Sequence, residues 1–210
     1  MSESTSVPPR RVAPFVAGAV AVVLAVLFGV LLVVEPSSDT AETVLLDRAA
    51  PAAVGKFDDG TAFELSRRRG SWVVLNFFTS TCIPCRNEHP ELIEFVDQQR
   101  SLGVNGAEFY TIVQNDDPAD VAAFFDEFGG DWPVVFDVDY SFQNGFGVAQ
   151  VPETWIIDPN GIVRGRVISE VSAEFLSTSI QNLRERLLAF LIASRRGPLG
   201  RPCSLLRSHY

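Results

Sequence analysis

Between Trp72 and Pro90 the chain reads Trp-Val-Val-Leu-Asn-Phe-Phe-Thr-Ser-Thr-Cys-Ile-Pro-Cys-Arg-Asn-Glu-His-Pro. The first seven residues form a nearly continuous apolar run, which is typical of a strand buried on both faces. Three small polar residues follow, and then the pair Cys82 and Cys85. After the pair, apolar residues recur at near-helical spacing, at Leu92, Phe95, Val96 and Leu102. This order predicts a strand, a short loop and a helix, with Cys82 at the start of the helix.

The predicted position of Cys82 favours redox chemistry. A thiol attacks a disulfide only as the thiolate, and an ordinary cysteine near neutral pH is mostly protonated. The dipole and free N–H groups of a helix N-terminus stabilise the anion. We therefore expect Cys82 to be the attacking thiol and Cys85 to resolve the mixed disulfide. Pro84 is expected in the first turn, where its missing N–H costs little.

Two structural alternatives compete with this interpretation. Three cysteines are too few for a disulfide-built scaffold, and a two-residue gap closes too short a loop to restrain much chain entropy. A zinc site would need two more ligands, which the chain offers only as His89, His209 and Cys203 besides carboxylates. The pair therefore indicates a redox-active dithiol, with no cofactor or metal expected.

The remaining pattern predicts an α/β fold. Four further strands are expected over 108–113, 134–136, 153–157 and 162–168, the last two joined by the turn Asp158-Pro159-Asn160-Gly161. One helix opens at Asp117-Pro118 and carries an apolar stripe of Val121, Phe124, Phe125 and Phe128. The last helix has an apolar face made of Leu176, Ile180, Leu183, Leu187 and Leu191. Together these elements predict a mixed central sheet flanked by helices.

An apolar run near the N-terminus predicts a membrane anchor. Residues 12–34 carry no charged side chain over 23 positions, whereas about 20 apolar residues span a bilayer as a helix. A cleaved signal peptide is the alternative, but its apolar stretch is usually only about 7–15 residues. Arg10 and Arg11 precede the run, and Arg48 is the one basic residue within about 15 residues after it. The N-terminus is therefore expected in the cytoplasm and the large domain outside the cell membrane.

These features divide the chain into five predicted parts. They are a cytoplasmic N-terminus at 1–11, a transmembrane helix at 12–34, a linker at 35–50, the α/β domain at 51–194 and a loose tail at 195–210. The formal net charge of −9 argues against nucleic acid as a partner. The short cluster of Arg67, Arg68 and Arg69 is interpreted as a solvated turn before a strand.

Two motifs resemble one known family. The segment from Trp72 to Pro90, and a second segment from Gly147 to Thr154 followed by Ile156-Ile157-Asp158 and Asn160-Gly161, are similar to the thioredoxin-like proteins that include TlpA, ResA and the cytochrome c maturation reductase CcmG (DsbE). The resemblance covers about residues 51–190. It implies a thioredoxin-like fold in which Pro152 is cis, lies against the cysteine pair and shapes a groove for a substrate strand.

The resemblance also assigns roles near the cysteines. Glu88, three residues after Cys85, matches a glutamate of the ResA and CcmG group, which implies that it tunes the cysteine pKa values and assists proton transfer. The alternative is a solvated first-turn glutamate favoured by the helix dipole. Asn76 stands where thioredoxin has a buried acid, and it cannot exchange protons. Thr81 departs from the tryptophan that commonly precedes the first cysteine, and His89 is expected on the helix surface.

The family implies a function and partners. The expected function is an extracytoplasmic reductase of partner disulfides, with apocytochrome c or its handling proteins as substrates and a CcdA- or DsbD-like membrane protein as electron donor. An oxidase or general disulfide exchanger would run the same chemistry in the other direction. A peroxidase and a non-catalytic binding module are further alternatives. Cys203 has no motif around it and is interpreted as a free thiol in the tail.

Overall fold

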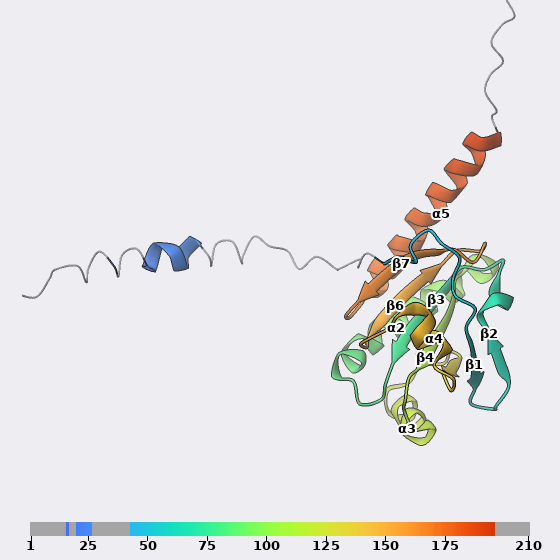
Figure 1. Cartoon of the computed structure of the whole chain (residues 1–210), viewed down its shortest axis with the longest axis horizontal. Helices are drawn as coiled ribbons and strands as arrows, with labels where there is room; N and C mark the ends of the chain where they lie inside the picture. Colours follow the sequence, from blue (N-terminus) through green and yellow to red (C-terminus); the bar gives the residue numbers. More distant parts are fainter. Residues whose placement is uncertain (1–15, 17–19, 27–42, 196–210) are drawn as a thin grey trace, which may run out of the picture. The chain divides into compact units, whose positions relative to one another are not determined.

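The computed structural model describes residues 16, 20–26 and 43–195 of the chain (Figure 1). The chain divides into two units, Met1–Ser37 and Ser38–Tyr210. Of the predicted anchor at 12–34, residues 16 and 20–26 are described, and 20–26 are helical; the remainder lies outside the described residues. Among the helices in the described ranges, none is both long and apolar enough to cross a membrane. The predicted cytoplasmic N-terminus, most of the linker and all but the first residue of the tail, including Cys203, also lie outside these ranges.

The second unit contains the strands and helices that the sequence predicts, with three additions. The strands are β1 (Val54–Phe57), β2 (Ala62–Glu64), β3 (Val73–Phe78), β4 (Glu108–Val113), β5 (Val134–Phe136), β6 (Glu153–Ile157) and β7 (Val163–Ile168). The helices are α2 (Ile83–Ser101), α3 (Pro118–Phe128), α4 (Ser141–Phe146) and α5 (Ala173–Arg195), with short 3₁₀ turns η1 (Leu65–Arg68) and η2 (Gly103–Asn105). The β1–β2 hairpin and α4 are not predicted from the sequence.

One mixed sheet carries the fold. Its strand order is β2-β1-β5-β4-β3-β6-β7, with β3, β4 and β5 parallel and the remaining pairs antiparallel. The helices α2, α3 and α5 contribute to the apolar clusters on one face, and α4 packs on the other (Figure 1). This arrangement confirms the predicted thioredoxin-like α/β fold with a mixed sheet.

The central strand β3 explains why the cysteines lie where they do. All six of its residues are buried, with Val73, Leu75 and Phe77 in the core on the α4 face and Val74 in the core beneath α2 and α5. A strand covered on both faces must be apolar throughout, which is the pattern that the sequence shows. Because β3 ends at Phe78, the following loop delivers Cys82 to the N-terminus of α2.

At two edges of the fold the structure differs from the local sequence pattern. Residues 43–50, assigned to a linker, join the domain: the N–H of Asp47 donates to the carbonyl of Val163, and Ala49 forms a β-bridge with Ile162. Leu102, the last apolar residue at near-helical spacing, is the C-cap residue of α2 and is 48% exposed. In both places the local pattern is too short for the sequence alone to show which side is covered.

Candidate active site

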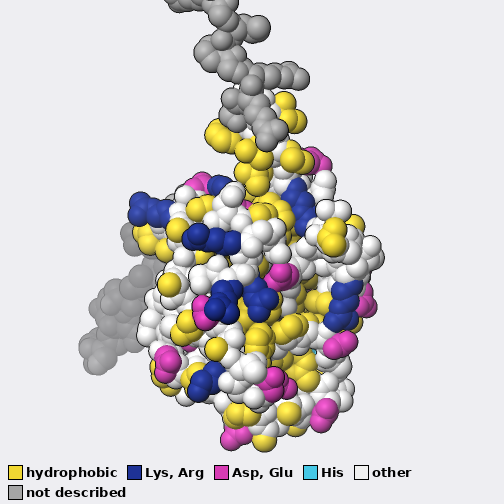
Figure 2. All heavy atoms as spheres, turned by 90° about the vertical axis from the view of Figure 1, so that its right-hand side faces the viewer, with side chains coloured by type: hydrophobic (Ala, Val, Ile, Leu, Met, Phe, Trp, Pro, Cys, Tyr) yellow, Lys and Arg dark blue, Asp and Glu magenta, His cyan; other side chains and the backbone are white. Residues whose placement is uncertain are grey.

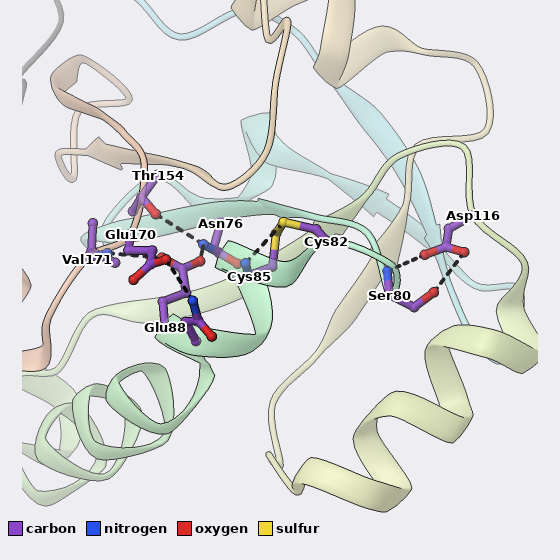
Figure 3. The surroundings of a disulfide bond; sticks show 10 residues. Asn76, Ser80, Cys82, Cys85, Glu88, Asp116, Thr154, Glu170 and Val171 are labelled. Atoms are coloured by element: carbon purple, nitrogen blue, oxygen red, sulfur yellow. Dashed lines mark hydrogen bonds between the residues drawn. A yellow bond between two sulfur atoms is a disulfide. The ribbon is translucent and has the colours of Figure 1, made fainter.

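The cysteine pair lies at the start of α2, as predicted, and forms a disulfide (Figure 3). Cys82 is the N-cap residue and is half-buried, whereas Cys85 is 1% exposed. The backbone N–H of Cys85 donates to the sulfur of Cys82 at 3.1 Å. Cys82 is therefore the more accessible sulfur, and it already accepts a hydrogen bond of the kind that stabilises a thiolate.

The first turn of α2 favours negative charge at Cys82. Neither Asp nor Glu occurs in that turn, so the positive end of the helix dipole is not offset there. Pro84 lies within the turn and removes only an N–H that would have no partner in the helix. Arg86 follows, with its guanidinium 4.8 Å from the ring centre of Phe128 on α3. The uncompensated helix dipole lowers the free energy of a thiolate relative to a thiol at Cys82.

The loop before Cys82 is held in place by hydrogen bonds to the loop that follows β4. The backbone N–H of Ser80 donates to Oδ2 of Asp116 at 2.5 Å, and its hydroxyl donates to Oδ1 at 3.2 Å (Figure 3). Asp116 lies in the loop that follows β4. The sequence analysis did not single out Asp116, because the contact joins residues 36 positions apart and no local pattern marks it.

Glu88 is buried beneath the cysteines and is 2% exposed. Its Oε1 accepts from Nδ2 of Asn76 at 2.8 Å, and its Oε2 accepts from the N–H of Val171 at 3.1 Å (Figure 3). Burial raises the pKa of this carboxyl from 4.5 to about 7; the two hydrogen bonds oppose the shift, and the nearby charge of Glu170 adds to it. The alternative of a solvated first-turn glutamate is therefore wrong.

Asn76 connects Glu88 to the segment that follows Pro152. It lies opposite Thr154 in the antiparallel β3–β6 pair, and its Nδ2 donates to the Thr154 hydroxyl at 3.1 Å as well as to Glu88. Its Oδ1 is buried and has no hydrogen-bond partner. The side chains of three elements, α2, β3 and β6, thus form one buried polar chain.

Pro152 follows a cis peptide bond and is buried at the start of β6. The preceding residue, Val151, packs against the apolar cluster that contains Cys85 and that also contacts Cys82. The next residue, Glu153, has a fully buried carboxylate that accepts from Nε of Arg166 at 2.9 Å and from Nε1 of Trp155 at 2.6 Å. The structure therefore brings the two predicted motifs together, with Pro152 fixed by the strand that follows it.

His89 is buried, so its prediction as a helix-surface residue is wrong. Its ring lies within an aromatic cluster of Phe124, Phe125 and Trp132, and its Nε2 is 2.8 Å from the carbonyl oxygen of Gly129. Burial lowers the pKa of this imidazole. These partners come from a distant part of the chain, which is why helical spacing alone did not reveal them. Thr81, by contrast, is exposed beside Cys82.

No group of three His, Cys, Asp or Glu side chains in the described residues is placed to hold a metal ion. The cationic cluster of Arg67, Arg68 and Arg69 lies at η1, where Arg67 is exposed and Arg68 is half-buried over the rings of Phe63 and Tyr110. The groups that the site brings together are the cysteine pair and the buried carboxyl beneath it.

Comparisons with known proteins agree with this geometry. Residues 46–166 match the family model described as AhpC/TSA family. The thiol-disulfide oxidoreductase ResA of Geobacillus thermodenitrificans is 28% identical over 141 residues, which cover 67% of this chain and 79% of that protein. The thiol:disulfide interchange protein HelX of Rhodobacter capsulatus is 30% identical over 117 residues, which cover 55% of this chain and 62% of that protein. A crystal structure of a thiol:disulfide interchange protein of the thioredoxin family from Chlorobium tepidum superposes with a TM-score of 0.55 at 25% identity, covering 67% of this chain and 97% of that one.

Proposed function

The chain belongs to the AhpC/TSA family, and we propose that it is an extracytoplasmic thiol–disulfide reductase that acts through Cys82 and Cys85. The thiol–disulfide oxidoreductase class follows from the relatives and from the cysteine pair. The observation that carries the proposal is the half-buried Cys82 sulfur at the N-terminus of α2, with the Cys85 N–H directed at it.

In the proposed reaction, two electrons pass from the protein to a partner disulfide. The Cys82 thiolate attacks one sulfur of the partner, forming a mixed disulfide and releasing the partner's other sulfur as a thiolate, which takes up a proton. Cys85 then loses its proton and attacks the Cys82 sulfur. This step forms the Cys82–Cys85 disulfide and releases the partner's second thiol. The observed disulfide is therefore the oxidised product of the cycle.

Glu88 is proposed to exchange the proton of Cys85. It lies one helical turn after Cys85, and with a pKa of about 7 it is present in both protonation states near neutral pH. Asn76 can serve either state, because its Nδ2 donates to the carboxylate and its otherwise unpartnered Oδ1 can accept from the protonated acid after a turn of the amide. The pair thus holds a proton beneath the cysteines.

The proposed substrate class is a protein disulfide in cytochrome c maturation. Haem attachment requires both thiols of a Cys-x-x-Cys-His motif to be reduced, and an oxidising compartment works against that state. The similarity to ResA and HelX supports this assignment. We further propose that residues 12–34 anchor the domain at the outer face of the cell membrane, where a CcdA- or DsbD-like protein would supply electrons.

A trapping experiment tests the attacking residue and the substrate together. The full chain with Cys85→Ser is mixed with an oxidised Cys-x-x-Cys-His peptide, and a covalent adduct through Cys82 that dithiothreitol releases is expected. Both variants also carry Cys203→Ser to remove the third thiol, and Cys82→Ser, the matched control, should then give no adduct. An adduct through Cys85 in that control would overturn the assigned roles. Oxidation of the reduced peptide by the wild-type disulfide, with no reaction in the reverse direction, would identify the protein as an oxidase.

A further inference from the structure

Near its C-terminal end, α5 leaves the domain along a run of apolar residues, 187–193. The helix packs against the core through Leu176, Ile180, Leu183 and Leu187, and it then continues beyond the sheet (Figure 1). In the part that projects, Leu188 is 58%, Phe190 is 70% and Ile192 is 54% exposed. Figure 2 shows hydrophobic side chains gathered on this projecting end. We call residues 187–193, which read Leu-Leu-Ala-Phe-Leu-Ile-Ala, the apolar tip of α5.

The sequence around the apolar tip is strongly basic in an acidic chain. Residues 184–210 contain six arginines and one glutamate, a formal charge of +5. Because the whole chain carries −9, residues 1–183 carry −14, from 11 basic and 25 acidic residues. Arg184 and Arg186 precede the apolar tip, and Arg195 and Arg196 follow it directly. Apolar surface and positive charge therefore coincide at one end of the chain.

We infer that the apolar tip of α5 docks into the surface of an anionic lipid bilayer. An apolar helical segment with flanking arginines can bury its side chains at the boundary of headgroups and acyl chains while the guanidinium groups contact lipid phosphates. Seven residues extend only about 10 Å as a helix, so the tip reaches into the interface and cannot span the bilayer. A second copy of the chain is a poorer occupant, because pairing two tips would bring two charges of +5 together.

Docking through α5 would fix the direction in which the disulfide faces. The start of α5 lies beside the half of α2 that begins at the cysteines, since the N–H of Val171 donates to Glu88 and the N–H of Ala173 donates to Glu91. Its far end lines a surface pocket with Gly70 and Asn105, beyond the other end of α2. Both helices run away from the cysteines, and the 19 residues of α2 span about 28 Å. The apolar tip and the disulfide therefore lie at opposite ends of the domain, and docking directs Cys82 away from the bilayer toward partners in the aqueous phase.

The test uses the full chain with Phe190→Trp, incorporated into vesicles of phosphatidylcholine and phosphatidylglycerol. Brominated acyl chains quench tryptophan on contact, and the three native tryptophans, at 8% exposure or less, provide the baseline in the unmodified chain. We expect the emission of the added tryptophan to be lost with brominated lipid. Val138→Trp is the matched control: Val138 is 54% exposed beside Asp116 at the disulfide end, and its emission should persist.

Charge variants and alternative outcomes sharpen the test. Arginine near an anionic surface contributes about 1 kcal/mol, so each removal should lower the ratio of docked to free helix about fivefold. Arg195→Gln with Arg196→Gln should therefore weaken quenching, as should vesicles of phosphatidylcholine alone. Emission at position 190 that shifts to the blue without quenching would mean that protein covers the tip, and this would overturn the inference, as would unshifted, unquenched emission. If the chain does not incorporate into vesicles, this contradicts the proposed anchor at 12–34 but not the docking of α5. The same variants added to preformed vesicles would then test the docking by the same quenching.

Discussion

Replacement of Glu88 by glutamine should remove the pH dependence of the free energy of unfolding that comes from titration of the Glu88 carboxyl. Folding raises the pKa of Glu88 from 4.5 to about 7, because the carboxyl is buried beneath the cysteines. A folded-state pKa above the unfolded value means that the folded protein binds the extra proton between these two pH values. The stabilisation is therefore fully present below about pH 4.5 and is lost as the pH rises through about 7.

The size of the effect follows from the shift. The rise in the pKa of Glu88 from 4.5 to about 7 corresponds to about 3 kcal/mol, because each pKa unit is worth about 1.4 kcal/mol. The free energy of unfolding of the wild-type protein should accordingly fall by about 3 kcal/mol more than that of Glu88→Gln between pH 4.5 and pH 8. The variant keeps the shape of the side chain, and Asn76 can turn its amide to offer either Oδ1 or Nδ2 to the new group.

Urea unfolding at the two pH values, with the disulfide intact in both proteins, measures this difference. The contributions of all other titrating groups to the pH dependence cancel when the variant is compared with the wild type. Glu94→Gln is the matched control, because Glu94 is an exposed glutamate on the same helix, and its pH dependence should parallel that of the wild type. Curves for wild type and Glu88→Gln that stay parallel from pH 4.5 to pH 8 would refute the argument that burial raises this pKa.

Two further substitutions test the elements that position the site. Glu153→Gln leaves the half-buried Arg166 without its carboxylate partner and should lower the free energy of unfolding by about 3 kcal/mol. Glu64→Gln, which breaks an exposed ion pair, should cost about 1 kcal/mol or less, and equal losses would refute the distinction. Asp116→Ala removes both hydrogen-bond acceptors of Ser80 and should lower the free energy of unfolding in urea by about 2 kcal/mol. It should also slow disulfide exchange with a model peptide, and an unchanged exchange rate would show that the loop before Cys82 does not position that residue.

The centre of the fold could be predicted because its signals are local. The apolar run of β3, the helix start at Cys82 and the turn after Ile157 each lie within a few residues of sequence, and all three are confirmed. The β1–β2 hairpin escaped prediction because strands of four and three residues carry too little pattern. The six residues of α4 are held by long-range packing of Phe142 and Phe146 in the core.

The candidate site divides in the same way. Cys82 and Cys85 follow from their spacing, but the environment of Glu88 does not. Its burial depends on Val171, which is 83 residues away in sequence, and on Asn76 from the adjoining strand. Helical spacing could place Glu88 on the same side of α2 as Cys85, and only the packing of α2 on the sheet and beside α5 shows that this side excludes water.

The reduction potential of the Cys82–Cys85 couple tests the central claim most directly. The full chain is equilibrated against thiol–disulfide buffers of known potential, and the fraction of reduced protein is measured by alkylation. A dedicated reductase requires a value near that of thioredoxin, and the account predicts about −250 mV or below. A value near about −120 mV, the range of strong oxidants, would contradict it and would identify the protein as an oxidase of thiols.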